Sequence, residues 1–229
     1  MASHQKIILY SCLVNKRDRI KPIEFDDGFK YVLFTDDLKA DAKGWEIRPV
    51  VWTSEDPVLT ARYHKHHPFV LFPDATYTIW LDMTHWAYQS LIPLLTNFDL
   101  MLHKHQERHT ICAEADICKF LKFDSPEIIE SQITHYKNDG FIDNIGLYST
   151  SCLIRKNTYQ CQMLSEMWWE EICKWSKRDQ ISLPYCLWRL GLTPGVIPGM
   201  DRGGFSQYFE MISHHKNYKT NNQCKLKII

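Results

Sequence analysis

Short apolar runs of strand length recur through the first half of this 229-residue chain. The first extends from Ile7 to Val14, and "YVLFTDD" and "ATYTIWLD" repeat the form, these two ending in acids. Near-continuous apolar runs are typical of strands buried on both faces, as in a covered parallel sheet. Helical patterns lie between and after them, most clearly over residues 158–176 and 178–191. This order predicts an α/β fold with a mixed, mainly parallel central sheet flanked by helices.

Composition narrows the class of protein. One domain over residues 1–229 is expected, because no repeat, low-complexity tract or linker divides the chain. The 27 basic and 27 acidic side chains balance, so no net field attracts nucleic acid or an anionic membrane. The N-terminal apolar run is too short for a membrane span, and the eight scattered cysteines indicate reduced thiols. A cytoplasmic protein is expected, either a bacterial or virus-encoded one or a domain cut from a longer chain.

The stretch "TIWLDMTHWA" brings a single acid, Asp82, to the end of an expected buried strand, with Thr84 two residues later. In α/β sheets, ligands bind at the carboxyl ends of strands, where Asp36 and Asp37 of "FTDD" would also lie. A divalent cation bound to a diphosphate needs only one or two protein carboxylates, so Asp82 is a candidate metal ligand. An ordinary turn or helix-cap acid is the alternative.

A basic cluster, "ARYHKHHP", precedes that strand, in a segment expected to be helical up to the residue before Pro68. A helix there would bring Arg62 and Lys65 near one side, where a guanidinium fork and an ammonium suit a diphosphate. A solvated basic face is the alternative. Near the C-terminus, the run His214–Lys216 could return to a metal and phosphate site or form a surface tail.

A third group, Arg178, Asp179 and Gln180, lies in "WSKRDQISLPY" at the start of an expected helix. Ser176 as the N-cap would place Asp179 at the third helical position in a capping box. The functional alternative is an acid that faces a pocket and binds or deprotonates a hydroxyl. Only the fold can bring this group to Asp82.

Taken together, these stretches resemble the GT-A class of nucleotide-sugar glycosyltransferases, and more narrowly the plant mucilage-related (MUCI-type) glycosyltransferase-like family. The resemblance extends from about Ile7 to about Leu190. It is carried by "YVLFTDD", "ARYHKHHPFVLFPDATYTIWLD", "AEADIC", "GLYSTSCLIRKN" and "WWEEICKWSKRDQISLPY". It implies a GT-A (Rossmann-like) fold and transfer of a sugar from a nucleotide-sugar donor to a hydroxyl of a glycan, glycoprotein or other acceptor.

The resemblance also implies roles for single residues. Asp82 would be the first acid of a DXD-type motif that binds Mn²⁺ or Mg²⁺, with Thr84 at the position of the second acid. Asp179 would be the base if the reaction inverts, with Gln180 beside it. The other implied roles are nucleotide contacts for Asp36 and Asp37, diphosphate contacts for Arg62, Lys65 and Lys216, a sugar or acceptor pocket at Glu114 and Arg178, and a late metal-binding histidine at His214 or His215.

Thr84 departs from the full DXD pattern, which would have an acid at that position. The metal would then rest on Asp82, water, the diphosphate and a histidine, and catalysis without a metal is the alternative. Two further interpretations stay open. One is a retaining transferase of the same fold, which requires no base, and the other is a non-catalytic module that binds sugar nucleotides or glycans.

Overall fold

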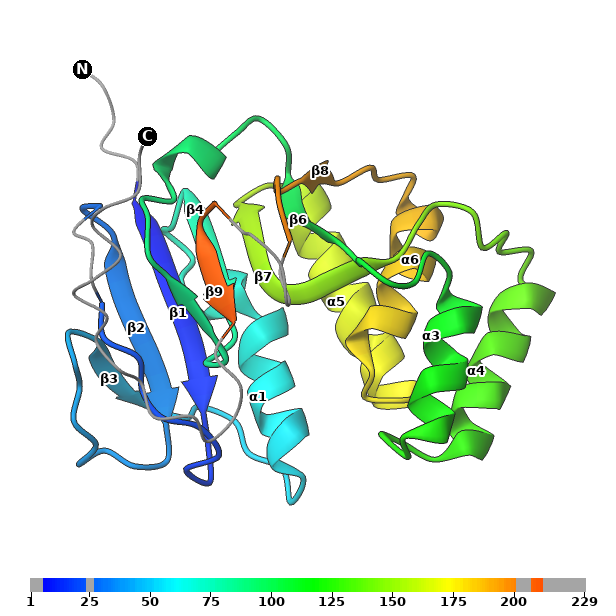
Figure 1. Ribbon diagram of the computed structural model, residues 1–229, viewed down its shortest axis with the longest axis horizontal. Coiled ribbons are helices and arrows are strands. Elements are labelled where there is room, and N and C mark those ends of the chain that lie inside the picture. Colours follow the sequence, from blue (N-terminus) through cyan, green and yellow to red (C-terminus); the bar gives the residue numbers. More distant parts are fainter. Residues whose placement is uncertain (1–5, 24–26, 201–206, 212–229) are drawn as a thin grey trace, which may run out of the picture.

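The strands of this computed structural model, which describes residues 6–23, 27–200 and 207–211, form one large sheet and a small ribbon (Figure 1). Their bounds are β1 (Ile7–Leu13), β2 (Lys30–Thr35), β3 (Glu46–Pro49), β4 (Tyr77–Leu81), β5 (His85–Ala87), β6 (Leu100–Lys104), β7 (Tyr148–Lys156), β8 (Gly195–Val196) and β9 (Phe209–Met211). The large sheet has the order β3-β2-β1-β4-β7-β6-β8. Only β7 runs antiparallel to its neighbours, β4 and β6, so the predicted mixed, mainly parallel sheet is confirmed for the described residues.

The helices gather on one face of this sheet. They are α1 (Pro57–His66), α2 (Pro68–Leu71), α3 (Ile111–Phe120), α4 (Pro126–Asn138), α5 (Tyr159–Lys174) and α6 (Asp179–Leu190), with a 3₁₀ turn, η1 (Ile92–Leu94). Local signals explain several ends: the Asp56 carboxylate accepts from the Val58 amide at the start of α1, and Ser125 caps α4 as predicted. Gly191 ends α6 in the left-handed region, where glycine is unstrained.

Alternate residues of each strand divide the core in two. In β1, Ile8 and Tyr10 pack with the helices, whereas Leu9 and Leu13 belong to a second cluster on the opposite face. That opposite face is covered by loops and by the β5–β9 ribbon, which the sequence did not predict; Figure 1 shows β9 in front of the sheet. The helical patterns in the sequence predicted the helices that cover one face. The cover of the other face depends on contacts between segments far apart in the chain, which those patterns do not show.

Two further expectations concern the whole chain. Among the described residues, no helix combines the length and the apolar character that crossing a bilayer requires. The seven cysteines of the described part are free thiols, and five of them are buried. Cys224 lies outside the described residues.

Candidate active site

A cavity of about 590 Å³ opens at the carboxyl ends of β1 and β4. Segments from both halves of the chain form its wall: the loop after β1, the first turn of α1, the end of β4, the start of β7 and the start of α6. Six of the residues that the sequence singled out line it, namely Arg62, Asp82, Thr84, Arg178, Asp179 and Gln180. The groups around Asp82 and around Asp179, almost a hundred residues apart in the chain, therefore meet. They do so at the strand ends, where α/β sheets bind ligands.

The acids after β2 lie beside this cavity and not in it. Asp36 and Asp37 line an adjoining shallow cavity together with Asn15 and Lys16, which border both cavities. The Asp36 carboxylate accepts from the Asn15 amide at 2.9 Å, and Asp37 pairs with Lys16 at 3.1 Å. The hydrogen bond from Lys16 is the main cause that lowers the pKa of Asp37. We predicted that these acids share a site with Asp82. In the structure they line a cavity next to the one that Asp82 lines.

Asp179 lies enclosed at the floor of the main cavity, with 1% of its surface exposed. Its Oδ2 lies 2.7 Å from both Lys65 Nζ and Arg62 Nη1, and it accepts a hydrogen bond from the Thr150 hydroxyl at 3.0 Å. Burial alone would raise the pKa of this carboxyl, but the charges of Arg62 and Lys65 outweigh burial and hold it well below its usual range. Asp179 is thus an ionised anchor for two cations.

Asp179 also begins its helix differently from the prediction. It is the first residue of α6, and Arg178 at the N-cap makes no side-chain capping bond. The expected capping box with Ser176 is wrong, because the Ser176 hydroxyl is buried and donates to Gln132 at 2.7 Å instead. The Trp168 indole donates to the Asp179 carbonyl at 3.0 Å, which ties the start of α6 to α5.

Lys65 lies behind the cavity wall and does not line it, which corrects the predicted contact between this residue and a diphosphate. Its side chain is fully buried, and its ammonium lies 3.9 Å from Asp82 Oδ1 as well as 2.7 Å from Asp179. Burial lowers the pKa of Lys65, while Asp179 and Asp82 oppose that shift. Arg62, one helical turn earlier, does reach the cavity.

Glu114 likewise lies behind the wall and holds a residue that lines it. Its Oε2 accepts from Arg108 Nε at 2.6 Å, and its Oε1 lies 3.7 Å from Arg178 Nη2. The Arg178 guanidinium also lies 4.7 Å from the centre of the Phe123 ring. Glu114 is 2% exposed, so it contacts the cavity only through Arg178.

The described residues near Asp82 do not fit a divalent cation. Asp82 Oδ1 already accepts from the Trp80 indole at 2.6 Å and lies near the Lys65 ammonium, while the Thr84 hydroxyl contacts the His85 ring. A cation here would have one carboxylate, whose Oδ1 is already engaged, and one hydroxyl, and the nearby Lys65 ammonium would repel it. Within the described ranges, no three His, Cys, Asp or Glu side chains form a metal-binding group. His214, His215 and Lys216 lie outside the described residues.

The cavity also contains residues that the sequence analysis did not single out. Lys16 and Arg17, in the loop after β1, add two cations to its wall, and Ser149–Ser151 add three hydroxyls from β7. The sequence signal for Lys16 and Arg17 was the charged run "NKRD" directly after an apolar strand. The signal for Ser149–Ser151 was a run of hydroxyl side chains inside a strand pattern, where apolar residues are usual.

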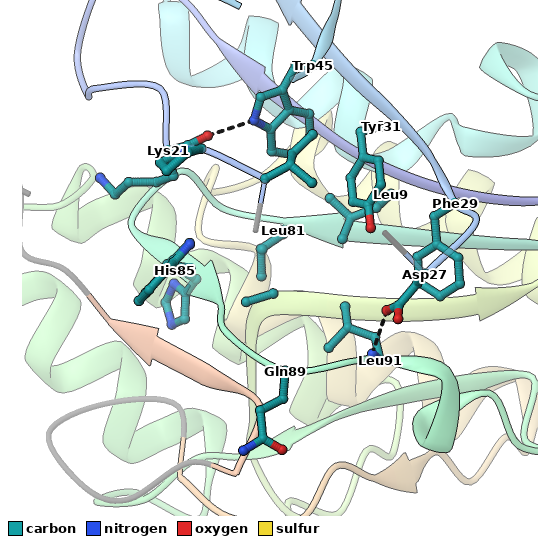
Figure 2. Close-up of a pocket in the computed structure, with 14 residues that line it drawn as sticks. Leu9, Lys21, Asp27, Phe29, Tyr31, Trp45, Leu81, His85, Gln89 and Leu91 are labelled. Atoms are coloured by element: carbon teal, nitrogen blue, oxygen red, sulfur yellow. Dashed lines mark hydrogen bonds between the residues drawn. The ribbon is translucent and has the colours of Figure 1, made fainter. Parts of the chain in front are cut away.

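A third, much smaller cavity lies on the opposite face of the sheet, between β1, β4 and β5 (Figure 2). Aromatic and aliphatic side chains dominate its wall, and its volume of about 30 Å³ has room for only a few waters. Two hydrogen bonds join residues of its wall: the Trp45 indole donates to the Lys21 carbonyl at 2.8 Å, and the Leu91 amide donates to Asp27 at 3.0 Å. A sugar nucleotide does not fit here, so the larger cavity is the candidate site.

The fold and the larger cavity define an α/β protein with a charged cavity at the carboxyl ends of its strands. The chain belongs to the TOD1/MUCI70 glycosyltransferase-like family, whose domain model matches residues 53–201. This match spans α1, β4, β7 and α6, which supply most of the cavity wall, and it confirms the resemblance to the MUCI-type family. No curated protein sequence matches the chain.

Proposed function

We propose that this protein is a glycosyltransferase that moves a sugar from a nucleotide-sugar donor to a hydroxyl of a glycan or glycoprotein. The observation that carries the proposal is the charge of the cavity. Four cationic side chains line it: Lys16, Arg17, Arg62 and Arg178. The first turns of α1 and α6 also border it, and helix N-termini favour anions. These groups suit the diphosphate of a nucleotide sugar.

The two arginines are held in place before any ligand binds. Asp179 pairs with Arg62 at 2.7 Å, and Glu114 lies 3.7 Å from Arg178. Groups fixed in advance stabilise developing charge without a reorganisation cost during the reaction. In this proposal, Arg62 and Arg178 stabilise the negative charge that grows on the diphosphate as the bond to the sugar breaks.

The surroundings of Asp179 favour a retaining reaction over an inverting one. A general base needs a pKa near the working pH and must reach the acceptor proton. Asp179 has a strongly lowered pKa and is almost fully enclosed by its partners Arg62 and Lys65. Inversion with Asp179 as the base, the other candidate, requires the carboxylate to leave those partners. NMR of the product distinguishes the two, because retention keeps the anomeric configuration of the donor.

A thermal-shift screen of nucleotide sugars tests the function, since a ligand that binds only the folded state raises the apparent stability. We expect one donor to raise the Tm and to be hydrolysed or transferred. Arg62→Met should lose this shift, whereas Arg189→Met, which removes a half-exposed arginine that does not line the cavity, should keep it. If no donor shifts the Tm and none is hydrolysed or transferred, the enzyme hypothesis is rejected.

A further inference from the structure

Lys65 is a fully buried cation between two acids that line the candidate site. We propose that the Lys65 ammonium takes the position, between Asp82 and Asp179, that a divalent cation takes in a two-carboxylate metal site. The protein would then bind the diphosphate of its donor without a metal ion. Donor binding without a metal ion rests on the proposed function. The position of the Lys65 ammonium between the two acids does not depend on that function.

The geometry identifies the position. Lys65 Nζ makes a close hydrogen-bonded ion pair with Asp179 Oδ2 at 2.7 Å and lies 3.9 Å from Asp82 Oδ1. The two carboxylates come from the start of α6 and from the residue after β4, so only the folded chain brings them to one cation. A metal ion shared by two carboxylates would need to stand in this space, which the ammonium already occupies.

The side chains that line the cavity carry a positive surplus before any metal ion is added. Four cations line the cavity, Lys16, Arg17, Arg62 and Arg178, together with three acids, Asp18, Asp82 and Asp179. Behind the wall, the Lys65 ammonium and the Glu114 carboxylate, which lies 3.7 Å from Arg178, add one charge of each sign. The surplus is positive, as a bound diphosphate requires, and a divalent cation placed next to the ammonium would be repelled in this partly desolvated region.

The ammonium is also held in place. None of the Lys65 side chain is exposed, so a ligand in the cavity does not displace it. The Tyr10 hydroxyl donates to the Lys65 carbonyl at 3.1 Å, and the ammonium lies 5.8 Å from the centre of the Trp80 ring. Lys65 therefore acts through Asp82 and Asp179 as a positioning residue and does not touch the substrate.

Electron paramagnetic resonance of Mn²⁺ tests the position without any donor. We expect the full-length wild-type chain to leave the spectrum of free Mn²⁺ unchanged. Lys65→Met keeps the length of the side chain but removes its charge, and it should create one Mn²⁺ site that a second change, Asp82→Asn, abolishes. Lys65→Gln repeats the test with a polar side chain if the methionine variant does not fold.

The outcomes separate this inference from the proposed function. A wild-type chain that binds Mn²⁺ in a way that Asp82→Asn removes overturns the inference, and so does a folded Lys65 variant that gains no Mn²⁺ site. Isothermal titration calorimetry with inorganic pyrophosphate, in the presence of EDTA, tests whether the protein binds a diphosphate without a metal ion. We expect wild-type binding in EDTA, weakened about tenfold by Lys65→Met, which is about 1.4 kcal/mol. Absence of wild-type pyrophosphate binding counts against the proposed function, while the Mn²⁺ result still decides the position of Lys65.

Discussion

Two of the cavities that the described residues form, the candidate site and the aromatic cavity, lie on opposite sides of β4 and differ in almost every property. The larger one, at the strand ends, collects ion pairs, helix N-termini and hydroxyls. The smaller one, against the face of the sheet, is lined mainly by aromatic and aliphatic side chains, and two hydrogen bonds join residues of its wall (Figure 2). The difference follows from the α/β architecture. Side chains on the face of a sheet are buried against other elements, whereas side chains at the strand ends face the turns, where polar groups gather.

The largest effect is expected at the floor of the charged cavity. Asp179→Asn removes the anion that lies 2.7 Å from the buried Lys65 and from Arg62, and loss of one partner from a buried ion pair costs about 3–5 kcal/mol. Urea denaturation measures the free energy of unfolding. Asp82→Asn is the control: its side chain is 34% exposed, so the loss should be clearly smaller. Equal losses would contradict the distinction between floor and wall.

The same carboxylate predicts a pH dependence. Because the folded-state pKa of Asp179 is lowered, its contribution to stability is complete above the unfolded value of about 3.9 and is lost as the pH falls below it. The wild-type chain should therefore lose more stability than Asp179→Asn between about pH 4 and pH 2. Acid denaturation followed by circular dichroism provides the measurement.

A smaller effect is expected in the aromatic cavity. Trp45→Phe removes the indole hydrogen bond to the Lys21 carbonyl and part of a ring that is 7% exposed, at a cost of about 2 kcal/mol. Binding of a nucleotide sugar should not change, because this cavity does not take the donor. If Trp45→Phe weakens donor binding by more than its loss of stability explains, the two cavities do not differ in function as proposed.

Low pH should also lower the free energy of unfolding through His66. His66 is fully buried, and burial together with the charge of Arg155 lowers its pKa well below the usual value. The unfolded chain takes up a proton as the pH falls below about 6.5 and the folded chain does not, so stability falls by up to about 1.4 kcal/mol per pH unit. In His66→Leu this slope should decrease. Neither ring nitrogen has a hydrogen-bond partner, so the substitution itself should cost little.

The smallest effect compares two buried threonines. Thr150 donates its hydroxyl to Asp179, so Thr150→Val should cost about 1 kcal/mol. The Thr78 hydroxyl, also buried, has no hydrogen-bond partner, so Thr78→Val should be neutral or stabilising. Thermal denaturation of the two variants gives the comparison. A Thr150→Val variant as stable as the wild-type chain would show that the hydrogen bond to Asp179 adds nothing to stability.

Local patterns predicted much of this fold. Apolar runs marked β1, β2 and β4, and the predicted helix before Pro68 is α1. The rule that ligand sites lie at strand ends pointed to Asp82, and the resemblance to the family brought Arg62 and Asp179 into the same site. The β5–β9 ribbon escaped prediction because it joins residues more than a hundred positions apart and has no strong period of its own.

The sequence alone determined the alternation of buried strands and amphipathic helices and the residues from which a charged site could form. These depend on local periodicity and on the chemistry of side chains. The tertiary structure decided which charges face the ligand and which support it. Arg62 reaches the cavity, whereas Lys65, three residues later on the same helix, is enclosed between Asp82 and Asp179. Burial and ion pairing depend on which distant segments meet, and no spacing along the chain encodes that directly.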